Sequence, residues 1–254
     1  MLDLQETYRV EQDKWNDIAR QQLARLQPSR YRDFYHYAQD QITMTGIAEF
    51  LGDLRGLKVL EVGCGLGKLT TLLAKSGAKV TAFDLSEMST YVARERAKLD
   101  GVVEQTTFCT AAGEQLPFAD ETFDVIFGKG VLHHLKAGPS RPELFRVLKR
   151  GGKAAFSEPL GMNPLLRIAR DYLPYRQKNP RGADKPLTYA DIRDWSQGFA
   201  YVSVREVQLL SMLERALGRN NRFTLLRKID DVLLRQVPPL RRFCRYAVLL
   251  FEKK

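Results

Sequence analysis

The stretch Val59-Leu60-Glu61-Val62-Gly63-Cys64-Gly65-Leu66-Gly67 has the pattern of a buried strand that runs into a glycine-rich turn. A helical pattern follows at once, from Lys68 to Lys75. Because glycine has no Cβ atom, a ligand can lie directly against the backbone of such a turn. The free N–H groups at the start of the helix favour a carboxylate or a phosphate. The sequence therefore predicts a strand–turn–helix unit that binds a ligand.

An acidic residue at the end of the next apolar run adds to this signal. Asp84 follows Val80–Phe83 and lies 21 residues after Gly63. At about this spacing an acidic side chain reaches the hydroxyls of a ribose. The two features by themselves do not separate a dinucleotide site from other nucleoside sites. The spacing G-x-G-x-G, with Lys68 where the dinucleotide motif has its third glycine, argues against a dinucleotide.

Strand and helix patterns alternate along most of the chain. We expect strands at 57–62, 79–83, 102–108, 123–127 and 153–156, with helices such as 68–75 and 89–99 between them. This alternation indicates a mostly parallel sheet with helices on both faces. Two further strands, at 202–210 and 244–251, close the sheet. The predicted fold is α/β and Rossmann-like, with seven strands.

The segments around this sheet predict a cap and a lid. Residues 1–50 are expected to form an N-terminal helical cap, and residues 51–158 the ligand-binding core. The proline-rich, basic segment 159–200 is expected to be an insertion after strand five that covers the site. Pro142 is expected to shorten the helix that follows Leu135. Residues 201–254 hold the closing strands of the same domain and a helix that Pro238-Pro239 stops. The apolar face of the cap is expected to hold Val10, Trp15, Ile18, Leu23 and Leu26.

Composition and charge limit the classes of protein to consider. The 254 residues carry a net charge of +10, and residues 201–254 alone hold 12 Lys and Arg against 5 Asp and Glu. Such an excess suits a solvated surface, an acidic substrate or an anionic membrane surface. No nucleic-acid-binding motif or metal-ligand spacing accompanies it, so we expect a small-molecule substrate, no metal and no nucleic-acid partner. Three scattered cysteines, a charged N-terminus and the lack of a long apolar run predict a cytoplasmic protein; the oligomeric state stays open.

Several short blocks follow one another in order over residues 57–158. They are Leu60-Glu61-Val62-Gly63-Cys64-Gly65-Leu66-Gly67, Phe83-Asp84-Leu85-Ser86-Glu87-Met88, Glu114-Gln115-Leu116-Pro117-Phe118, Phe123-Asp124-Val125-Ile126, Leu132-His133-His134-Leu135 and Arg146-Val147-Leu148-Lys149-Arg150-Gly151-Gly152. Each block is common by itself, whereas their order is specific. In this order they resemble the class I S-adenosylmethionine (SAM)-dependent methyltransferases, in the branch that includes the ubiquinone/menaquinone-type enzymes.

The resemblance implies a role in SAM binding for several residues. Glu61 would orient the turn or reach the ammonium of SAM through water, and Asp84 would accept from the ribose hydroxyls. Ala112 stands where the family often carries an Asp, so adenine would be read by the segment Gly113-Glu114-Gln115 or its backbone. Lys129 is expected either to pair with the SAM carboxylate or to be solvated. The glycines Gly63, Gly65 and Gly67 would line the methionine and ribose, Cys64 would fill the turn, and Leu85, Met88 and Leu116 would pack on adenine.

Catalytic candidates are fewer. His133, or its neighbour His134, has the chemistry of a general base, although this block occurs in the family whatever the reaction. Glu158 follows strand five, where side chains of α/β proteins face the ligand, so it is expected either to face the substrate or to cap the next segment. Tyr175 belongs to a group of cap tyrosines that can either pack or stabilise a sulfonium by cation–π attraction. The other members of that group are Tyr31, Tyr35 and Tyr172, and nearby arginines that suit an acidic substrate or solvent are Arg167, Arg170 and Arg176.

Four functions fit these residues. The first is transfer of the SAM methyl group to an oxygen, nitrogen or carbon of a small metabolite. The second keeps the fold but cyclises SAM itself, which would resemble the azetidine-2-carboxylate synthases and release methylthioadenosine. The third is a non-catalytic SAM-binding module. The fourth, nucleic-acid methylation, rests only on the basic C-terminal segment and lacks the Asn/Asp-Pro-Pro-Tyr/Phe signature after strand four.

Overall fold

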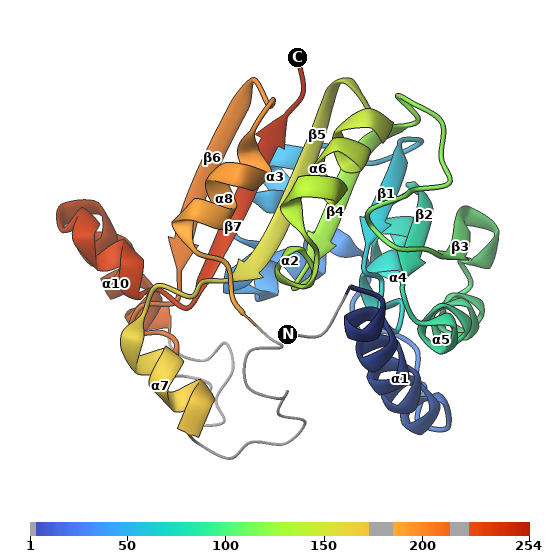
Figure 1. Ribbon diagram of the computed structural model, residues 1–254, viewed down its shortest axis with the longest axis horizontal. Coiled ribbons are helices and arrows are strands. Elements are labelled where there is room, and N and C mark those ends of the chain that lie inside the picture. Colours follow the sequence, from blue (N-terminus) through green and yellow to red (C-terminus); the bar gives the residue numbers. More distant parts are fainter. Residues whose placement is uncertain (1–3, 173–184, 214–223) are drawn as a thin grey trace.

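The computed structural model describes residues 4–172, 185–213 and 224–254. In these residues seven strands form one sheet, which confirms the predicted fold class (Figure 1). The strands are β1 (Lys58–Val62), β2 (Lys79–Asp84), β3 (Thr106–Thr110), β4 (Phe123–Lys129), β5 (Leu148–Pro159), β6 (Tyr201–Val207) and β7 (Tyr246–Glu252). Their order is β3-β2-β1-β4-β5-β7-β6. All neighbours from β3 to β5 pair in parallel, whereas β7 is antiparallel to both β5 and β6.

Helices cover both faces of the sheet because its strands are apolar on both sides. Val125 and Phe127 of β4 belong to one core cluster, while Ile126 between them belongs to the other. Side chains of α2, α3, α4 and α5 complete the first cluster, and side chains of α6 and α8 complete the second. The bounds are α2 (Phe34–Asp40), α3 (Ile47–Leu51), α4 (Lys68–Lys75), α5 (Glu87–Leu99), α6 (Ala137–Val147) and α8 (Tyr189–Ser196).

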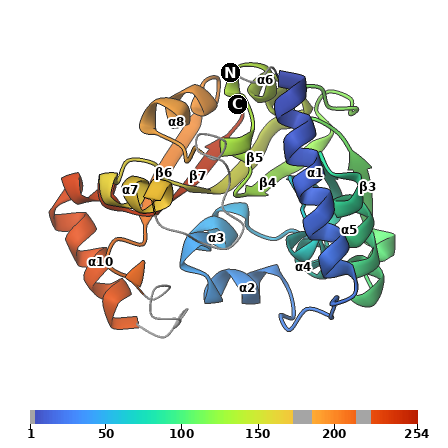
Figure 2. The ribbon, with the colours of Figure 1, turned by 60° about the horizontal axis from the view of Figure 1, so that its bottom comes forward.

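Three further helices lie outside these layers. They are α1 (Leu4–Leu23), α7 (Pro164–Tyr172) and α10 (Thr224–Gln236). The parallel strands all end at one edge of the sheet, and α1 and α7 lie at that edge (Figure 1). Figure 2 brings this edge forward and shows α1 along α5, with α7 and α10 together at the opposite corner. Short 3-10 helices are η1 (Ile42–Met44), η2 (Val103–Gln105), η3 (Leu132–His134) and η4 (Pro238–Phe243).

The structure corrects four details of the sequence prediction. The strand expected at 102–108 begins only at Thr106, because η2 occupies Val103–Gln105. The closing strands are shifted by a few residues, to 201–207 and 246–252. Helix α6 continues through Pro142, because the burial of Leu144 and Val147 beyond it outweighs one lost backbone hydrogen bond.

The fourth correction concerns the N-terminal helix. Val10, expected on its apolar face, is 47% exposed. Helix α1 instead contacts the β2–α5 region through Gln12, Asn16 and Ala19, which follow one another at helical spacing. The side chains of Gln12 and Asn16 bond the backbone or side chains of residues 85–88, and Ala19 is fully buried. Polar groups therefore dock this helix, which hydrophobic periodicity does not reveal.

Candidate functional site

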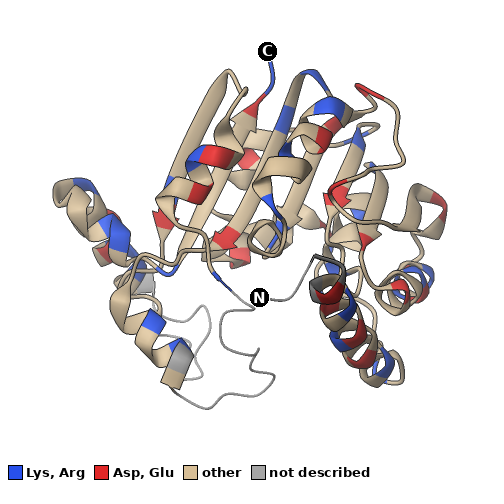
Figure 3. Ribbon diagram, in the orientation of Figure 1, with Lys and Arg blue, Asp and Glu red and all other residues tan. Residues whose placement is uncertain are grey.

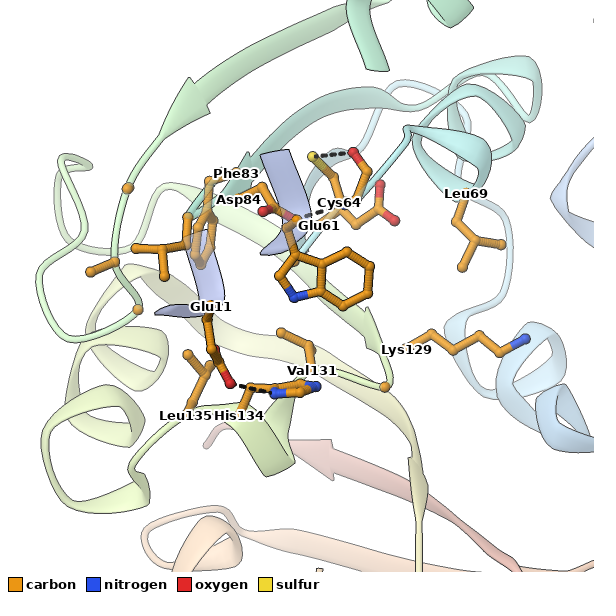
Figure 4. A pocket seen from close by; sticks show the side chains of 18 of the residues that line it. Glu11, Glu61, Cys64, Leu69, Phe83, Asp84, Lys129, Val131, His134 and Leu135 are labelled. Carbon is orange, nitrogen blue, oxygen red and sulfur yellow. Dashed lines mark hydrogen bonds and ion pairs between the residues drawn. The ribbon is translucent and has the colours of Figure 1, made fainter. Parts of the chain in front are cut away.

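A pocket of about 360 Å³ opens at the carboxyl ends of β1, β2 and β4 (Figure 4). Its floor is the glycine-rich turn after β1, the end of β2, and residues 111–114. The end of β4, the turn that follows it and the end of η3 form one wall, and α1 and α2 contribute side chains from the cap. Ligands of open α/β sheets bind at this edge.

The three glycines of the turn serve different purposes. Gly63 has φ +64°, and a Cβ atom there would lie 2.4 Å from Cγ2 of Val131. Gly67 has φ +73° and lies against the backbone of Ala93, so it permits the close approach of α4 and α5 and does not line the pocket. A Cβ on Gly65 would meet no atom within 4 Å, which leaves this part of the turn open to a ligand.

Asp84 is fixed by the backbone around it. One carboxylate oxygen accepts the N–H of Gly65 at 2.8 Å, and the other accepts the N–H of Ser86 at 3.0 Å. Burial raises the pKa of Asp84 above its usual value despite these hydrogen bonds. The carboxylate thus sits at a defined point of the pocket lining, at the end of β2.

Glu61 lines the same pocket from the end of β1 and is only 3% exposed. Its carboxylate accepts a hydrogen bond from the hydroxyl of Thr70. Burial raises the pKa of Glu61 to about 8, and the nearby charge of Asp84 acts in the same direction. A cation bound beside Glu61 would favour the ionised form again.

Two polar side chains in the lining, Tyr8 and Glu114, interact with each other but form no hydrogen bond of ordinary geometry. Neither carboxylate oxygen of Glu114 has a hydrogen bond within the described part of the chain, and the hydroxyl of Tyr8 has none there either. Burial, and then Glu114, raise the pKa of Tyr8. A buried polar group without a partner costs about 1–3 kcal/mol, more when it is charged. This end of the pocket, beside Ala112, is therefore built for a ligand that donates hydrogen bonds.

Two lysines gather around one tyrosine ring elsewhere in the lining. Lys129 donates to the hydroxyl of Tyr37 at 2.8 Å, and its ammonium lies 5.2 Å from the ring centroid. The ammonium of Lys68 lies 4.9 Å from the same centroid. Burial lowers the pKa of both lysines, and the charge of Lys129 lowers that of Lys68 further. Within the described residues neither lysine pairs with a carboxylate, so the cluster has the charge that suits an anion.

The two histidines have separate environments. His134 lines the pocket, and its Nδ1 lies 2.9 Å from a carboxylate oxygen of Glu11 on α1 (Figure 4). His133 does not line the pocket; its Nδ1 lies 2.7 Å from Glu158. Glu158 is fully buried, and its other oxygen accepts the N–H groups of Val131 and Leu132. The expected substrate-facing position of Glu158 is therefore wrong: its carboxylate holds the turn after β4.

The remaining predicted residues divide clearly. Leu85, Cys64 and Gly113 line the pocket. A Cβ atom on Gly113 would lie 3.0 Å from Cδ2 of Leu135. Leu116 is buried in the core next to it, 4% exposed. Tyr35 bonds the backbone of Gly52 and Leu54, and Tyr31 packs edge-on to Tyr37, so both pack within the cap. Met88 and Gln115 lie outside the lining, Tyr172 and Arg167 are exposed, and Tyr175 and Arg176 lie outside the described residues.

Sequence reasoning missed most of the cap's contribution. Tyr8, Glu11 and Trp15 reach the pocket from α1, and Tyr37 reaches it from α2. Their spacing of three to four residues along α1 is the one signal that was available for the first three. In the sequence, Lys68 stands out only as a departure from the dinucleotide motif. Among the described residues no group of three or more His, Cys, Asp or Glu could hold a metal ion.

Comparison with known proteins agrees with this geometry. The sequence model of a family described as a methyltransferase domain matches residues 60–156. A methyltransferase of Streptomyces halstedii is 37% identical over 41% of this chain and 38% of its own length. A ubiquinone/menaquinone biosynthesis C-methyltransferase of Pasteurella multocida is 35% identical over 48% of this chain and 47% of its own length. The chain thus spans about half the length, or less, of these curated relatives.

Solved structures share the fold over a longer stretch. A [4+2]-cyclase superposes with a TM-score of 0.62 at 17% identity, over 94% of this chain and 93% of its own. A phosphoethanolamine N-methyltransferase of Haemonchus contortus, solved with SAM, superposes with a TM-score of 0.60 at 20% identity, over 83% and 52%. At such identities the likeness extends to the fold alone.

Proposed function

Because the chain belongs to the class I SAM-dependent methyltransferases of the ubiquinone/menaquinone type, we propose that it transfers a methyl group from SAM to an oxygen, nitrogen or carbon atom of a small metabolite. The observation that carries the proposal is the distribution of charge in the pocket. Carboxylates of Asp84, Glu61 and Glu114 line one part, and the ammonium groups of Lys68 and Lys129 line another. SAM carries hydrogen-bond donors and an ammonium at some positions and a carboxylate at another, which matches this distribution.

The acidic residues suit the adenosine and the ammonium group. Asp84 is held at the end of β2, where an acidic side chain of similar methyltransferases accepts hydrogen bonds from the ribose hydroxyls. Glu114 has two buried oxygens without hydrogen bonds, which suits the amino group of adenine and compensates for Ala112. Glu61, deep in the pocket, suits the ammonium because a neighbouring cation relieves the cost of its burial.

The lysines suit the carboxylate. Lys129 is held against the Tyr37 hydroxyl, so its direction is fixed before a ligand arrives. Two ammonium groups on one ring repel each other, and an anion between them removes this repulsion. Of the two alternatives left open for Lys129, pairing with a carboxylate is therefore the one that its position supports.

Bound SAM supplies a methyl group on a positively charged sulfur, which is reactive without further activation. The protein's task is to orient the acceptor and to exclude water. Tyr8, Trp15 and Tyr37 cover the pocket from the cap and restrict access of water. His134 is the imidazole in the lining, and its Nδ1 lies against a carboxylate oxygen of Glu11. We assign to it, in place of His133, removal of the proton from a hydroxyl or amine acceptor.

Mass spectrometry of the whole chain, incubated with SAM alone and then with a metabolite extract, tests this function. We expect S-adenosylhomocysteine only when the extract is present, together with a metabolite that has gained one methyl group. His134→Asn is expected to bind SAM normally and to form product about a hundredfold more slowly or worse. His133→Asn is the matched control, because His133 does not line the pocket.

Two other outcomes would overturn the proposal. Methylthioadenosine formed from SAM alone would show that SAM itself is cyclised, which is the second function predicted from the sequence. Tight SAM binding with neither product, across a broad panel of acceptors, would show a non-catalytic module.

A further inference from the structure

Exposed apolar side chains concentrate at the corner formed by α7 and α10. Leu165 is 73% exposed, Tyr172 70%, Leu225 67% and Ile168 55%. Leu165, Tyr172 and Leu225 are the three most exposed large hydrophobic residues in the part of the chain that the structure describes. Scattered single residues of this kind are ordinary, whereas a cluster marks an interaction surface.

In α7 the exposed residues form one stripe. Leu165, Ile168 and Tyr172 are three and four residues apart, so they lie on the same side of the helix. Arg167 and Arg170 fall on the other side of the helical projection. The helix is thus strongly amphipathic, yet its apolar side faces outward.

In α10 the arrangement repeats with a fixed orientation. The carboxylate of Asp230 is buried and accepts the N–H groups of Leu209 and Leu210, which sets the inner side of the helix. Leu225 and Val232 lie on the outer side, 67% and 51% exposed. Lys228 and Arg235 flank this stripe and are also exposed. Two helices therefore present an apolar stripe to solvent with cations on the same helix.

The surroundings add positive charge. Arg241 and Arg242 of η4 are exposed beside α10, and Asn163, just before α7, donates to the carbonyl of Phe243 at the end of η4. This hydrogen bond ties the two helices to one corner. Asp231, an acidic residue on the exposed side of α10, pairs with Arg205 of β6. Figure 3 shows the Lys and Arg residues on α7 and α10.

We propose that α7 and α10 dock this protein on an anionic lipid surface. Leucine, isoleucine, valine and tyrosine side chains enter the boundary between headgroups and acyl chains, while Lys228 and Arg235, which flank the stripe of α10, pair with lipid phosphates. The charge complementarity selects an anionic bilayer as the occupant. No helix among the described residues is long and apolar enough to cross a membrane, so the contact is with the surface. Helix α7 lies at the carboxyl edge of the sheet, at the corner opposite α1 (Figure 2).

Flotation of the whole chain with lipid vesicles tests this surface. We expect co-flotation with phosphatidylcholine vesicles that contain about one third phosphatidylglycerol, little with phosphatidylcholine alone, and release by high salt. Leu165→Ser/Ile168→Ser and, separately, Leu225→Ser/Val232→Ser remove one stripe each. Lys228→Glu/Arg235→Glu reverses two flanking charges and should lower the partition coefficient by about tenfold or more.

Matched controls use α5, far from this corner. Leu99→Ser changes a leucine that is 51% exposed, and Arg94→Glu reverses an exposed charge. Both should float like the unchanged protein, and thermal unfolding confirms that every variant is folded. The proposal is wrong if the unchanged protein does not float with anionic vesicles, or if the controls reduce flotation as much as the stripe variants. Self-association lost with the stripes, without any flotation, would instead assign the surface to a second copy of the chain. No step of this test depends on SAM or on methyl transfer.

Discussion

At the scale of single residues, Glu114 offers the most direct test of the pocket. Its two buried oxygens have no hydrogen bond in the described structure, and we assign them to the adenine amino group. Glu114→Ala should therefore weaken SAM binding by about tenfold to a hundredfold, the usual value of a hydrogen bond to a charged group. Isothermal titration measures the change. The neighbour Gln115 lies outside the lining, so Gln115→Ala should bind SAM normally; equal losses in both variants would contradict the assignment.

Glu61 predicts a dependence of stability on pH. Its pKa rises from 4.5 to about 8 on folding, because burial favours the neutral form. Between pH 4.5 and about pH 8 the folded protein thus holds a proton on Glu61 that the unfolded protein has released. Its contribution to stability is complete below the unfolded pKa and is lost as the pH rises through the folded pKa.

Glu61→Gln keeps the shape of the side chain and removes this titration. The difference in free energy of unfolding between the unchanged protein and the variant should therefore move in favour of the variant from pH 4.5 to pH 8, and stay constant above. Urea unfolding of both proteins at each pH measures it, since titrating groups that do not interact with Glu61 cancel in the difference. A difference that does not change with pH would show that folding does not raise the pKa of Glu61.

Residues fixed by local sequence were predictable, and residues brought in from a distance were not. The glycine turn and Asp84 lie within one strand–turn–helix–strand unit, so spacing alone places Gly63, Gly65 and Asp84 at the pocket. Tyr8 and Tyr37 come from the cap, and only the packing of that cap brings them there. Glu158 shows the converse: it has the right place along the chain, but its carboxylate turns toward backbone N–H groups.

At the scale of elements, α1 is the part of the cap whose position matters most. It carries three pocket residues and is held to the β2–α5 turn by Asn16, whose side-chain oxygen accepts from Ser86 Oγ at 2.7 Å and from Met88 N–H at 3.2 Å. Asn16→Ala should loosen α1 and weaken SAM binding about threefold to tenfold, the value of one ordinary hydrogen bond or slightly more. Hydrogen exchange in α1 should rise as well.

The adjacent residue provides the control for α1. Asp17 is exposed and pairs with Arg20 on the same helix, a contact of little energetic weight. Asp17→Ala should leave both SAM binding and exchange in α1 unchanged. If Asn16→Ala speeds exchange without weakening SAM binding, α1 covers the pocket but does not contribute to affinity.

The elements also show where pattern reasoning ends. Strands β1, β2 and β4 are buried on both faces and read clearly as apolar runs, whereas the start of β3 was displaced because Val102 and Val103 extend the apolar run into η2. Amphipathic periodicity identified helices but not their environment. An apolar helical face is usually buried, whereas the apolar faces of α7 and α10 are exposed.

At the scale of the whole molecule, two strands distant in sequence complete the sheet. Strand β7 inserts antiparallel between β5 and β6, and so the C-terminal segment supports β5 and the turn that Glu158 holds. The number of strands and the fold class followed from alternation and resemblance. The order in which β7 and β6 join the edge depends on long-range pairing, which no local pattern specifies.

Ligand binding should stabilise this whole sheet, because the pocket joins the ends of three strands to the cap. A ligand that binds only the folded state adds about 2.7 kcal/mol when present at a hundred times its Kd. For a chain of this size that corresponds to a rise in Tm of roughly 5–10 °C. Differential scanning fluorimetry with SAM and with S-adenosylhomocysteine measures the shift, and NAD is the matched comparison because it shares the adenosine but not the amino-acid end.

We expect a shift with the first two ligands and none with NAD, since Lys68 replaces the third glycine of the dinucleotide motif. An equal shift with NAD would mean that the pocket recognises adenosine alone. It would contradict the assignment of the lysines around Tyr37 to the carboxylate of SAM.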